Sequence, residues 1–142
     1  MADRTANVTW TGSLMEGSGR IESVGSGVFG PLDVTWASRT EDPGGRTSPE
    51  ELIAAAHASC FSMALSHALA QAGSPPDRLR TSATVTFVPG TGITKIALYV
   101  RGSVPGMDEA IFLEKAEVAK LTCPVSKALS AVPEITLDAA LD

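Results

Sequence analysis

The sequence predicts a domain of the α+β class, in which runs of short strands lie on either side of one long apolar helix. Alternating apolar and polar residues predict the strands, and an uninterrupted apolar stretch with clear start and stop signals predicts the helix. A chain of 142 residues, 44% of them hydrophobic, is long and apolar enough to bury one core. We therefore predict a single domain over residues 1–142.

The first forty residues predict an antiparallel meander of three short strands. Each predicted strand alternates apolar and polar residues, and glycine-rich turns separate them. The predicted strands are 7–11, 20–24 and 32–36. The segment 41–47 is rich in Pro, Gly and charged residues and is predicted to be a loop.

The helix that follows has well-defined ends. Ser48 is a suitable N-cap, Pro49 suits the first helical position, and Glu51 completes the spacing of a capping box. Gly73, with two prolines shortly after it, ends the helix. Because the segment is apolar on all sides, we predict a central helix that is buried on most of its faces.

The apolar stretch 52–72 is long enough to raise the question of a membrane span. Alanine predominates in it, and alanine inserts weakly into membranes. Polar residues also interrupt it, namely His57, Ser59, Ser62, Ser66, His67 and Gln71. We interpret it as a core helix with no membrane partner. Residues 1–5 lack the pattern of a signal peptide, so a cytoplasmic location is expected.

The second half of the chain predicts two strands, two helices and a last strand. Asp108 is the predicted cap of the first of these helices, and Pro124 is the predicted first residue of the second. The predicted strands are 82–88, 93–101 and 134–138, and the predicted helices are about 107–121 and 124–131.

Charge and motif content exclude some classes of partner. The net charge is -5, and no run of five basic residues occurs, which argues against a nucleic-acid surface. The glycine-rich segments match no phosphate-binding motif and are interpreted as turns.

The two cysteines are the strongest candidates for chemistry. In a cytoplasmic protein a pair of cysteines is more often catalytic or metal-binding than structural. Cys123 precedes a predicted helix, where the helix dipole favours a thiolate, although a small buried residue would fit there equally well. Cys60 lies within the long helix, where burial alone raises a thiol pKa, so a reactive Cys60 needs a nearby cation. A core role for Cys60 stays open.

Two further interpretations depend on neighbours of Cys60. His57 and Cys60, with Cys123 from another helix, could bind zinc, but no recognised ligand spacing supports a metal site. Glu50 and Glu51 suit the positive end of the helix, and a functional role for either would be to orient an arginine. Spacing alone does not decide between these roles.

Three segments make the sequence similar to the osmotically inducible protein C (OsmC) family, which includes the organic hydroperoxide resistance proteins. They read SPEELIAAAHASCFSMAL at 48–65, ITKIAL at 93–98 and CPVSKAL at 123–129. The segment around His57 and the N-terminal extension resemble the OsmC branch. The resemblance covers nearly the whole chain. It implies an α+β protomer with antiparallel sheets packed around a long buried central helix, in an intertwined homodimer whose active sites lie at the dimer interface.

The resemblance also implies an activity, that of a thiol-dependent peroxidase that converts organic hydroperoxides to alcohols without haem, flavin or metal. Cys60 would be the peroxidatic residue and Cys123 the resolving residue. Glu50 would hold the activating arginine, for which Arg39 is the best match. Arg46 and Arg20 remain alternatives, because the chain has an extra residue before Ser48.

The same resemblance implies the partners of the reaction. The pair would be regenerated by an external dithiol reductant, with a lipoylated protein or a thioredoxin-like protein as candidate donors. An apolar setting for Cys60 favours alkyl or lipid hydroperoxides over hydrogen peroxide. The alternative functions are a thiol redox sensor, or a protein that binds a small ligand or a metal without efficient turnover.

Overall fold

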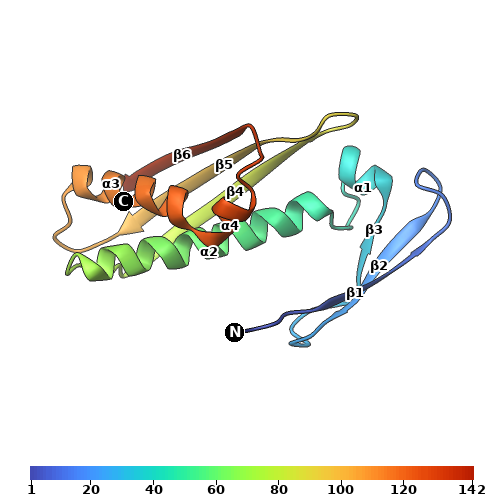
Figure 1. The fold of residues 1–142 in the computed structure, drawn as a ribbon, viewed down its shortest axis with the longest axis horizontal. Coiled ribbons are helices and arrows are strands. Elements are labelled where there is room, and N and C mark those ends of the chain that lie inside the picture. Colours follow the sequence, from blue (N-terminus) through green and yellow to red (C-terminus); the bar gives the residue numbers. More distant parts are fainter. The chain divides into compact units, whose positions relative to one another are not determined.

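The computed structural model describes residues 1–142, which form two units, Met1–Leu52 and Ile53–Asp142. Each unit contains one three-stranded sheet. The longest helix, α2 (Pro49–Gln71), begins in the first unit and continues in the second (Figure 1). The α+β class is confirmed, whereas the single domain over 1–142 stays a prediction.

The first unit contains the predicted antiparallel meander. The strands β1 (Ala6–Thr11), β2 (Ser18–Val24) and β3 (Leu32–Val34) pair in the order β1-β2-β3. In β2, Gly19 leaves room for the Trp10 ring, because a Cβ atom there would lie 2.6 Å from the Trp10 side chain. A larger residue at this position would separate the two strands.

A short helix, α1 (Trp36–Thr40), follows β3 and was not predicted. The predicted strand 32–36 therefore ends two residues early, at Val34. The Thr35 hydroxyl accepts a hydrogen bond from the Ser38 N–H, and the Ser38 hydroxyl accepts one from the Thr35 N–H. This is a capping box with serine in the place of the usual glutamate or glutamine, so its sequence signal is weak.

The start of α2 agrees with its sequence signals, with one difference. The Ser48 hydroxyl accepts a hydrogen bond from the Glu51 N–H at 3.1 Å, as a capping serine should. The Glu51 carboxylate accepts a hydrogen bond from the Thr47 hydroxyl, also at 3.1 Å, and so interacts with the residue before the cap. The predicted loop 41–47 is confirmed, with a single bridge between Val34 and Thr47 at its end.

The second unit has a sheet of β4 (Arg78–Val88), β5 (Gly92–Ser103) and β6 (Glu134–Leu141), in that order. β4 and β5 form the predicted hairpin, in which β4 begins earlier than expected and β5 is longer at both ends. β6 pairs in parallel with β5, so this sheet is mixed rather than wholly antiparallel. A parallel pair needs a long connection, which the helices α3 (Glu109–Thr122) and α4 (Pro124–Ala128) provide.

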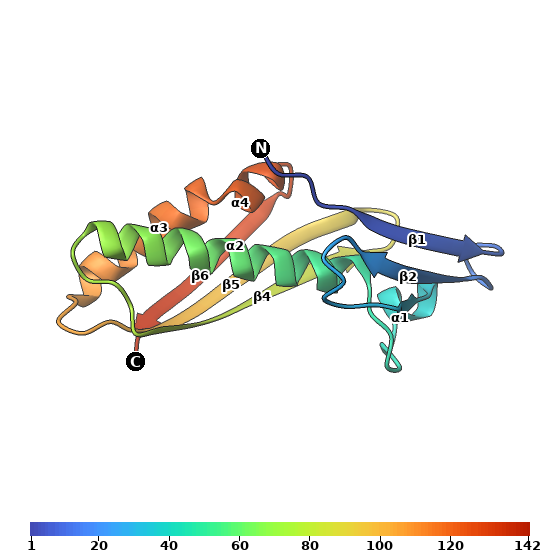
Figure 2. The ribbon, with the colours of Figure 1, turned by 90° about the horizontal axis from the view of Figure 1, so that it is seen from below.

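The core of the second unit lies between α2, α3 and one face of this sheet (Figures 1 and 2). Ile96, Leu98 and Val100 alternate along β5 and are buried on that face. Phe112 and Ala116 from α3 join the same cluster. The predicted helix 124–131 is shorter than expected, because α4 ends at Ala128 and the last three predicted residues are not helical.

The burial of α2 differs from the prediction. One stripe, at every fourth residue, has no exposed side-chain surface; it comprises His57, Phe61, Leu65 and Leu69. The opposite face is open in the single chain, where Met63 is 74% exposed. By length and composition alone α2 could cross a membrane, a property that core helices of soluble proteins share. The helix is therefore central but covered on one side only.

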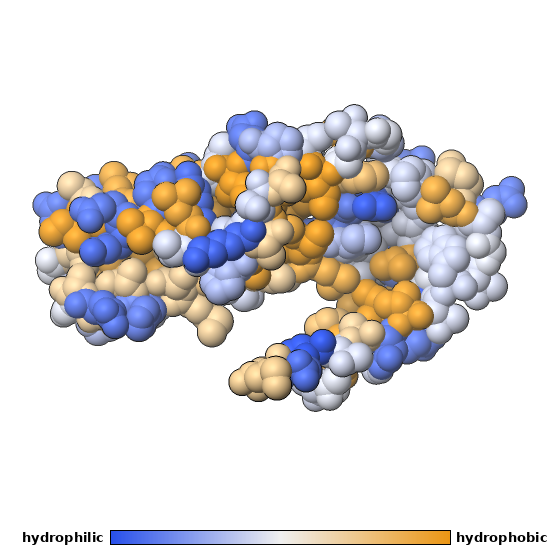
Figure 3. Space-filling view, in the orientation of Figure 1, coloured by the Kyte–Doolittle hydropathy of each residue, from blue (hydrophilic) through white to orange (hydrophobic).

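The surface over α3 mixes apolar and charged residues (Figure 3). Ile111, Leu113, Val118 and Leu121 are all at least 40% exposed there. Single apolar residues separated by charges are common on protein surfaces and indicate no site by themselves.

Candidate functional site

In the first unit, the geometry brings Arg39 and Glu50 together. The Arg39 Nη2 atom lies 2.7 Å from the Glu50 Oε1 atom, and the Arg39 Nε atom lies 3.0 and 3.1 Å from the two carboxylate oxygens. A guanidinium that donates from two nitrogens to one carboxylate is held in a fixed orientation. The Trp36 ring supports it further, with its centroid 6.0 Å from the Arg39 Cζ atom.

Local structure explains this pair. α1 carries Arg39 in its last turn, and the loop that follows returns the chain to the first turn of α2, where Glu50 lies. Ser38 stabilises this return, because its hydroxyl also donates to the Thr47 carbonyl at 3.0 Å. The resemblance implied an arginine salt-bridged to Glu50, and Arg39 is the arginine found there. Its effect on Cys60 stays a prediction.

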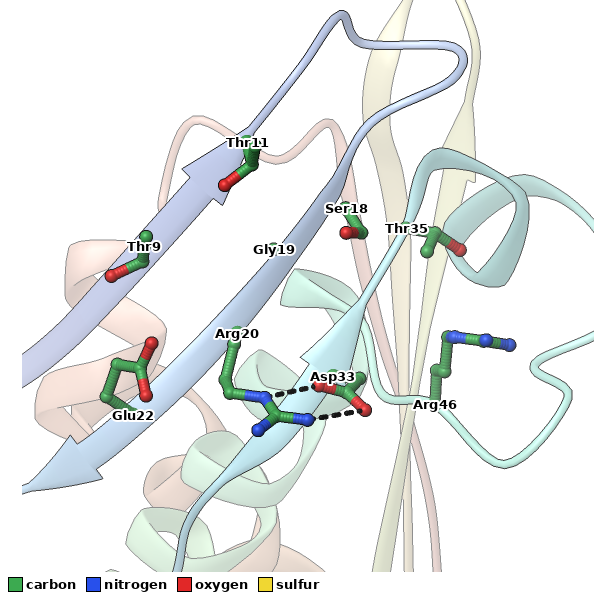
Figure 4. Close-up of a pocket in the computed structure, with 9 residues that line it drawn as sticks. All are labelled: Thr9, Thr11, Ser18, Gly19, Arg20, Glu22, Asp33, Thr35 and Arg46. Carbon is green, nitrogen blue, oxygen red and sulfur yellow. Dashed lines mark hydrogen bonds and ion pairs between the residues drawn. The ribbon is translucent and has the colours of Figure 1, made fainter.

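The two alternative arginines line a polar cavity of about 390 Å³ in the first unit (Figure 4). Its lining consists of Thr9, Thr11, Ser18, Gly19, Arg20, Glu22, Asp33, Thr35 and Arg46. Arg20 is paired there with Asp33, with 2.8 Å between the Nε and Oδ1 atoms. Hydrogen bonding from Arg20 lowers the pKa of Asp33, although both side chains are about half exposed. Arg20 thus has its own carboxylate partner, and that partner is not Glu50.

In the second unit, the side chains of Cys60 and Cys123 are in hydrogen-bond contact. The two cysteines are 63 positions apart, and the chain between them includes the β4–β5 hairpin and α3, which bring the start of α4 back to α2. Both cysteines are free thiols, Cys60 partly exposed and Cys123 fully buried. This arrangement permits a disulfide between two thiols that are remote in sequence.

Burial raises the pKa of the Cys60 thiol, and the hydrogen bond with Cys123 raises it further. The Val125 N–H acts in the opposite direction, because it donates to the Cys60 sulfur and so favours the thiolate. From the sequence, we expected the dipole of the helix that begins at Pro124 to act on Cys123 and not on Cys60. α4 in fact directs one of its first N–H groups at Cys60, while Cys123 is the residue just before the helix.

His57 lies one turn before Cys60 and is fully buried. Its Nε2 atom is 2.7 Å from the Ser126 Oγ atom, which is buried too. Its Nδ1 atom has no hydrogen-bond partner. Burial lowers the pKa of His57, so the ring is neutral at physiological pH.

The zinc alternative lacks a set of ligands. No three His, Cys, Asp or Glu side chains are arranged to hold a metal ion. The Nε2 atom of His57 is hydrogen-bonded to Ser126 and is not available to a metal. His67 is exposed, whereas His57 is fully buried.

Sequence reasoning missed Ser126 and Val125. A signal for Ser126 was present, because Cys123 and Ser126 repeat the three-residue spacing of His57 and Cys60. Residues three apart share one side of a helical turn, so two such pairs on facing helices can make two contacts side by side.

Comparison with known proteins places this geometry in a family. The family model described as "OsmC-like protein" matches residues 42–138. The chain is 46% identical to the peroxiredoxin OsmC of Escherichia coli over 132 residues, which cover 91% of this chain and 90% of that protein. It is 33% identical to an organic hydroperoxide resistance protein of Xanthomonas axonopodis over 100 residues, 66% of this chain and 67% of that protein.

Solved structures have the same fold. The organic hydroperoxide resistance protein OhrB of Bacillus subtilis superposes with a TM-score of 0.65 at 25% identity, over 97% of this chain and 98% of that one. A Legionella pneumophila protein described as an organic hydroperoxide resistance protein OsmC gives 0.70 at 22% identity, over 96% of both chains. The sequence matches and these folds agree with the resemblance, and the chain belongs to the OsmC-like protein family.

Proposed function

We propose that this protein is a thiol-dependent peroxidase that reduces organic hydroperoxides to alcohols through Cys60 and Cys123. Membership of a family that includes proteins named peroxiredoxin and organic hydroperoxide resistance protein supports a peroxidase-type function. The observation that supports the thiol mechanism is the direct contact between two free cysteine side chains. Such contact lets the oxidised product of one thiol be captured by the other.

The proposed cycle has three steps. The Cys60 thiolate attacks the distal peroxide oxygen, so that an S–O bond forms, the O–O bond breaks and the alkoxide leaves as the alcohol after taking a proton. The Cys123 sulfur then attacks the Cys60 sulfenic acid, forming the S–S bond as hydroxide leaves and takes the Cys123 proton to become water. An external dithiol reduces the disulfide by two exchange reactions and restores both thiols.

The first step needs a thiolate, and burial opposes one at Cys60. We propose that Arg39, oriented by Glu50, supplies the positive charge that lowers the pKa of Cys60 in the active enzyme. Arginine suits this role because it stays charged at every physiological pH and its orientation is fixed by the carboxylate.

We also propose an oligomeric state, a cellular location and a reductant for the enzyme. The open face of α2, which includes the 74% exposed Met63, supports a homodimer in which a second copy covers the helix. The reaction as written uses only thiols, so no bound cofactor is proposed. The location is proposed to be cytoplasmic, where dithiol reductants are available. A lipoylated or thioredoxin-like protein is the proposed type of reductant.

The decisive experiment separates the two thiols. The reduced protein is mixed with one equivalent of cumene hydroperoxide or of hydrogen peroxide, and the products are mapped by mass spectrometry. We expect rapid formation of a Cys60–Cys123 disulfide with the organic peroxide and a slower reaction with hydrogen peroxide. Cys60→Ser should abolish peroxide consumption, whereas Cys123→Ser should consume one equivalent and stop at a sulfenic acid that dimedone traps.

Two results would contradict the proposal. Persistence of both thiols after the peroxide is added would exclude the peroxidase mechanism. Full steady-state turnover of Cys123→Ser with a dithiol reductant would exclude Cys123 as the resolving residue. The contact between two free thiols also fits one second candidate, a thiol redox sensor that uses the same pair. Slow oxidation at saturating reductant would favour the sensor.

A further inference from the structure

The buried hydrogen bond between His57 and Ser126 joins the same two helices that carry the cysteines. His57 has no exposed surface, Ser126 is 6% exposed, and the Nε2 and Oγ atoms are 2.7 Å apart. The two residues are 69 positions apart in the chain, so this is a tertiary contact and not part of a helix or turn. The proposed peroxide chemistry gives neither residue a role.

The hydrogen bond between His57 and Ser126 has the same spacing from the thiols on both helices. His57 precedes Cys60 by three residues on α2, and Ser126 follows Cys123 by three residues at the start of α4. The two helices therefore touch at two adjacent places, through the thiols at one and through the imidazole and hydroxyl at the other. A bond one helical turn from the thiols restricts how far the thiols can move apart.

α4 needs such an external contact. It has only five residues, fewer than an isolated helix needs to be stable. Its N-cap is Cys123, whose side chain makes no capping hydrogen bond. The Cys123 backbone is held from the other side, because Cys123 is also the C-cap of α3 and its N–H donates to the Ala119 carbonyl. Neither helix gives the Cys123 side chain a capping bond, so its direction depends on tertiary contacts such as that of Ser126.

The hydrogen-bond partners of His57 indicate which of its ring nitrogens carries the proton. Nδ1 is buried without a partner, and a buried lone pair without a partner costs less than a buried N–H without one. The neutral ring therefore carries its proton on Nε2 and donates to the Ser126 oxygen. A donor of fixed direction, on the rigid core helix α2, holds a residue of the short helix α4.

We propose that His57 and Ser126 are positioning residues that hold Cys123 against Cys60 for formation of the disulfide. The inference rests on the proposed function for its biological meaning, because that function makes Cys123 the resolving residue. The pair takes no part in the bond changes themselves. It raises the effective concentration of the Cys123 thiol at Cys60, on which the rate of the resolving step and the stability of the disulfide both depend.

The test measures the equilibrium of the pair in glutathione redox buffers, which needs no peroxide and no catalytic turnover. The fraction of Cys60–Cys123 disulfide is followed by mass spectrometry in wild type and in Ser126→Ala. We expect the effective concentration to fall about tenfold in Ser126→Ala, the size of effect that the loss of one buried hydrogen bond produces. A purely structural role would lower the melting temperature but leave this equilibrium unchanged.

Four further variants test whether the effect comes from this hydrogen bond. His57→Leu should reproduce the effect of Ser126→Ala, and the double variant should lose no more than about as much as either single one, because all three lack the same bond. His57→Gln should keep most of the wild-type value, since its side-chain amide can donate to the Ser126 oxygen. Ser62→Ala is the matched control, because it removes a 2.8 Å hydrogen bond from α2 to Thr81 of β4 and leaves α4 untouched.

The outcomes separate this inference from the proposed function. An effective concentration in Ser126→Ala within about twofold of wild type, or an equal loss in Ser62→Ala, would overturn the inference. A wild-type protein that forms the disulfide with glutathione but not with cumene hydroperoxide would overturn the peroxidase proposal, and the glutathione comparison would still decide the role of His57 and Ser126. Absence of the disulfide from wild type in both reactions would overturn both.

Discussion

Arg39 contacts Glu50 through two guanidinium nitrogens, and the two side chains differ in burial. The Glu50 side chain is 8% exposed, whereas that of Arg39 is 29% exposed. A carboxylate that is nearly buried needs its charge partner. Glu50 is thus the buried member of the pair, and it fixes the orientation of the more exposed Arg39 guanidinium.

Replacing Arg39 should therefore have two separable effects. Arg39→Ala should lower the free energy of unfolding by about 1–3 kcal/mol, because the buried Glu50 carboxylate loses its charged hydrogen bonds. It should also raise the pKa of Cys60 and slow peroxide consumption by at least about tenfold, which corresponds to one pKa unit of lost thiolate stabilisation. Urea unfolding and the pH dependence of thiol alkylation measure the two effects.

The controls for Arg39 come from the first unit. Arg39→Lys should recover part of the stability but little of the activity, since an ammonium cannot form the forked contact. Arg20→Ala should leave the Cys60 titration unchanged, because Arg20 is paired with Asp33. An unchanged titration in Arg39→Ala would instead point to Arg46 or Arg20 as the activating residue.

His57 should make the stability of the protein fall in mildly acidic solution. Burial lowers the pKa of His57 in the folded state below its ordinary value of 6.5. Below that pH the unfolded chain binds a proton that the folded chain does not, so the stability from His57 is complete above pH 6.5 and is lost as the pH falls below it. One proton gives a slope of at most about 1.4 kcal/mol per pH unit.

The measurement is the free energy of unfolding between pH 7.5 and pH 5, where the ordinary carboxylates remain mostly ionised. His57→Gln removes the titrating group and should flatten the profile in this range. A wild-type profile as flat as that of the variant would contradict a neutral, buried His57.

The buried stripe of α2 should dominate its contribution to stability. Leu65 is fully buried in the core of the second unit, and Leu65→Ala should cost about 2–5 kcal/mol through lost burial and the resulting cavity. Met63, two residues earlier, is 74% exposed, and Met63→Ala should change the stability of the monomer by less than about 0.5 kcal/mol. Chemical denaturation at low protein concentration makes this comparison.

The same two variants test the proposed homodimer. A cost of Met63→Ala that grows with protein concentration would indicate that a second copy covers the open face of α2. Equal costs for the two variants at every concentration would contradict the one-sided burial of the helix.

Gly102 should not tolerate a side chain, although its backbone conformation would accept one. A Cβ atom at this buried position of β5 would lie 2.8 Å from the Phe112 ring of α3. Gly102→Ala should therefore displace Phe112 and lower the free energy of unfolding by about 1–3 kcal/mol, a typical cost of overpacking. Ser103→Ala is the neighbouring control, with an expected change of less than about 0.5 kcal/mol, and thermal melts can compare the two.

The sequence alone was sufficient for most of the secondary structure. The ends of α2 and the cap of α3 follow local rules, and the structure agrees with them: the Asp108 carboxylate accepts hydrogen bonds from Ala110 and Ile111. α1 was missed because serine replaces the usual acidic or amide residue of a capping box. The parallel direction of β6 was missed because strand direction depends on long-range pairing and leaves no local signal.

The candidate site could be predicted only in part. The cysteines stand out by their residue type, and the family resemblance supplied Arg39 and Glu50 as candidates. The hydrogen bond between His57 and Ser126 could not be predicted without the fold, because the two residues are 69 positions apart. The direction of the Cys60 pKa also depends on tertiary structure, namely burial and the contacts from Cys123 and Val125.

The parallel pairing of β6 with β5 also bears on the order in which contacts are expected to form during folding. The pairing joins Lys95 to Glu134 and continues to Gly102 and Leu141, across a connection that contains α3 and α4. Contacts so remote in sequence form late, after local elements such as the β4–β5 hairpin. Cys123 lies within that connection, 63 positions from Cys60, so we expect its contact with Cys60 to form after the hairpin as well. Thiols that meet late would stay apart in a partly folded chain, which would protect it from premature cross-linking.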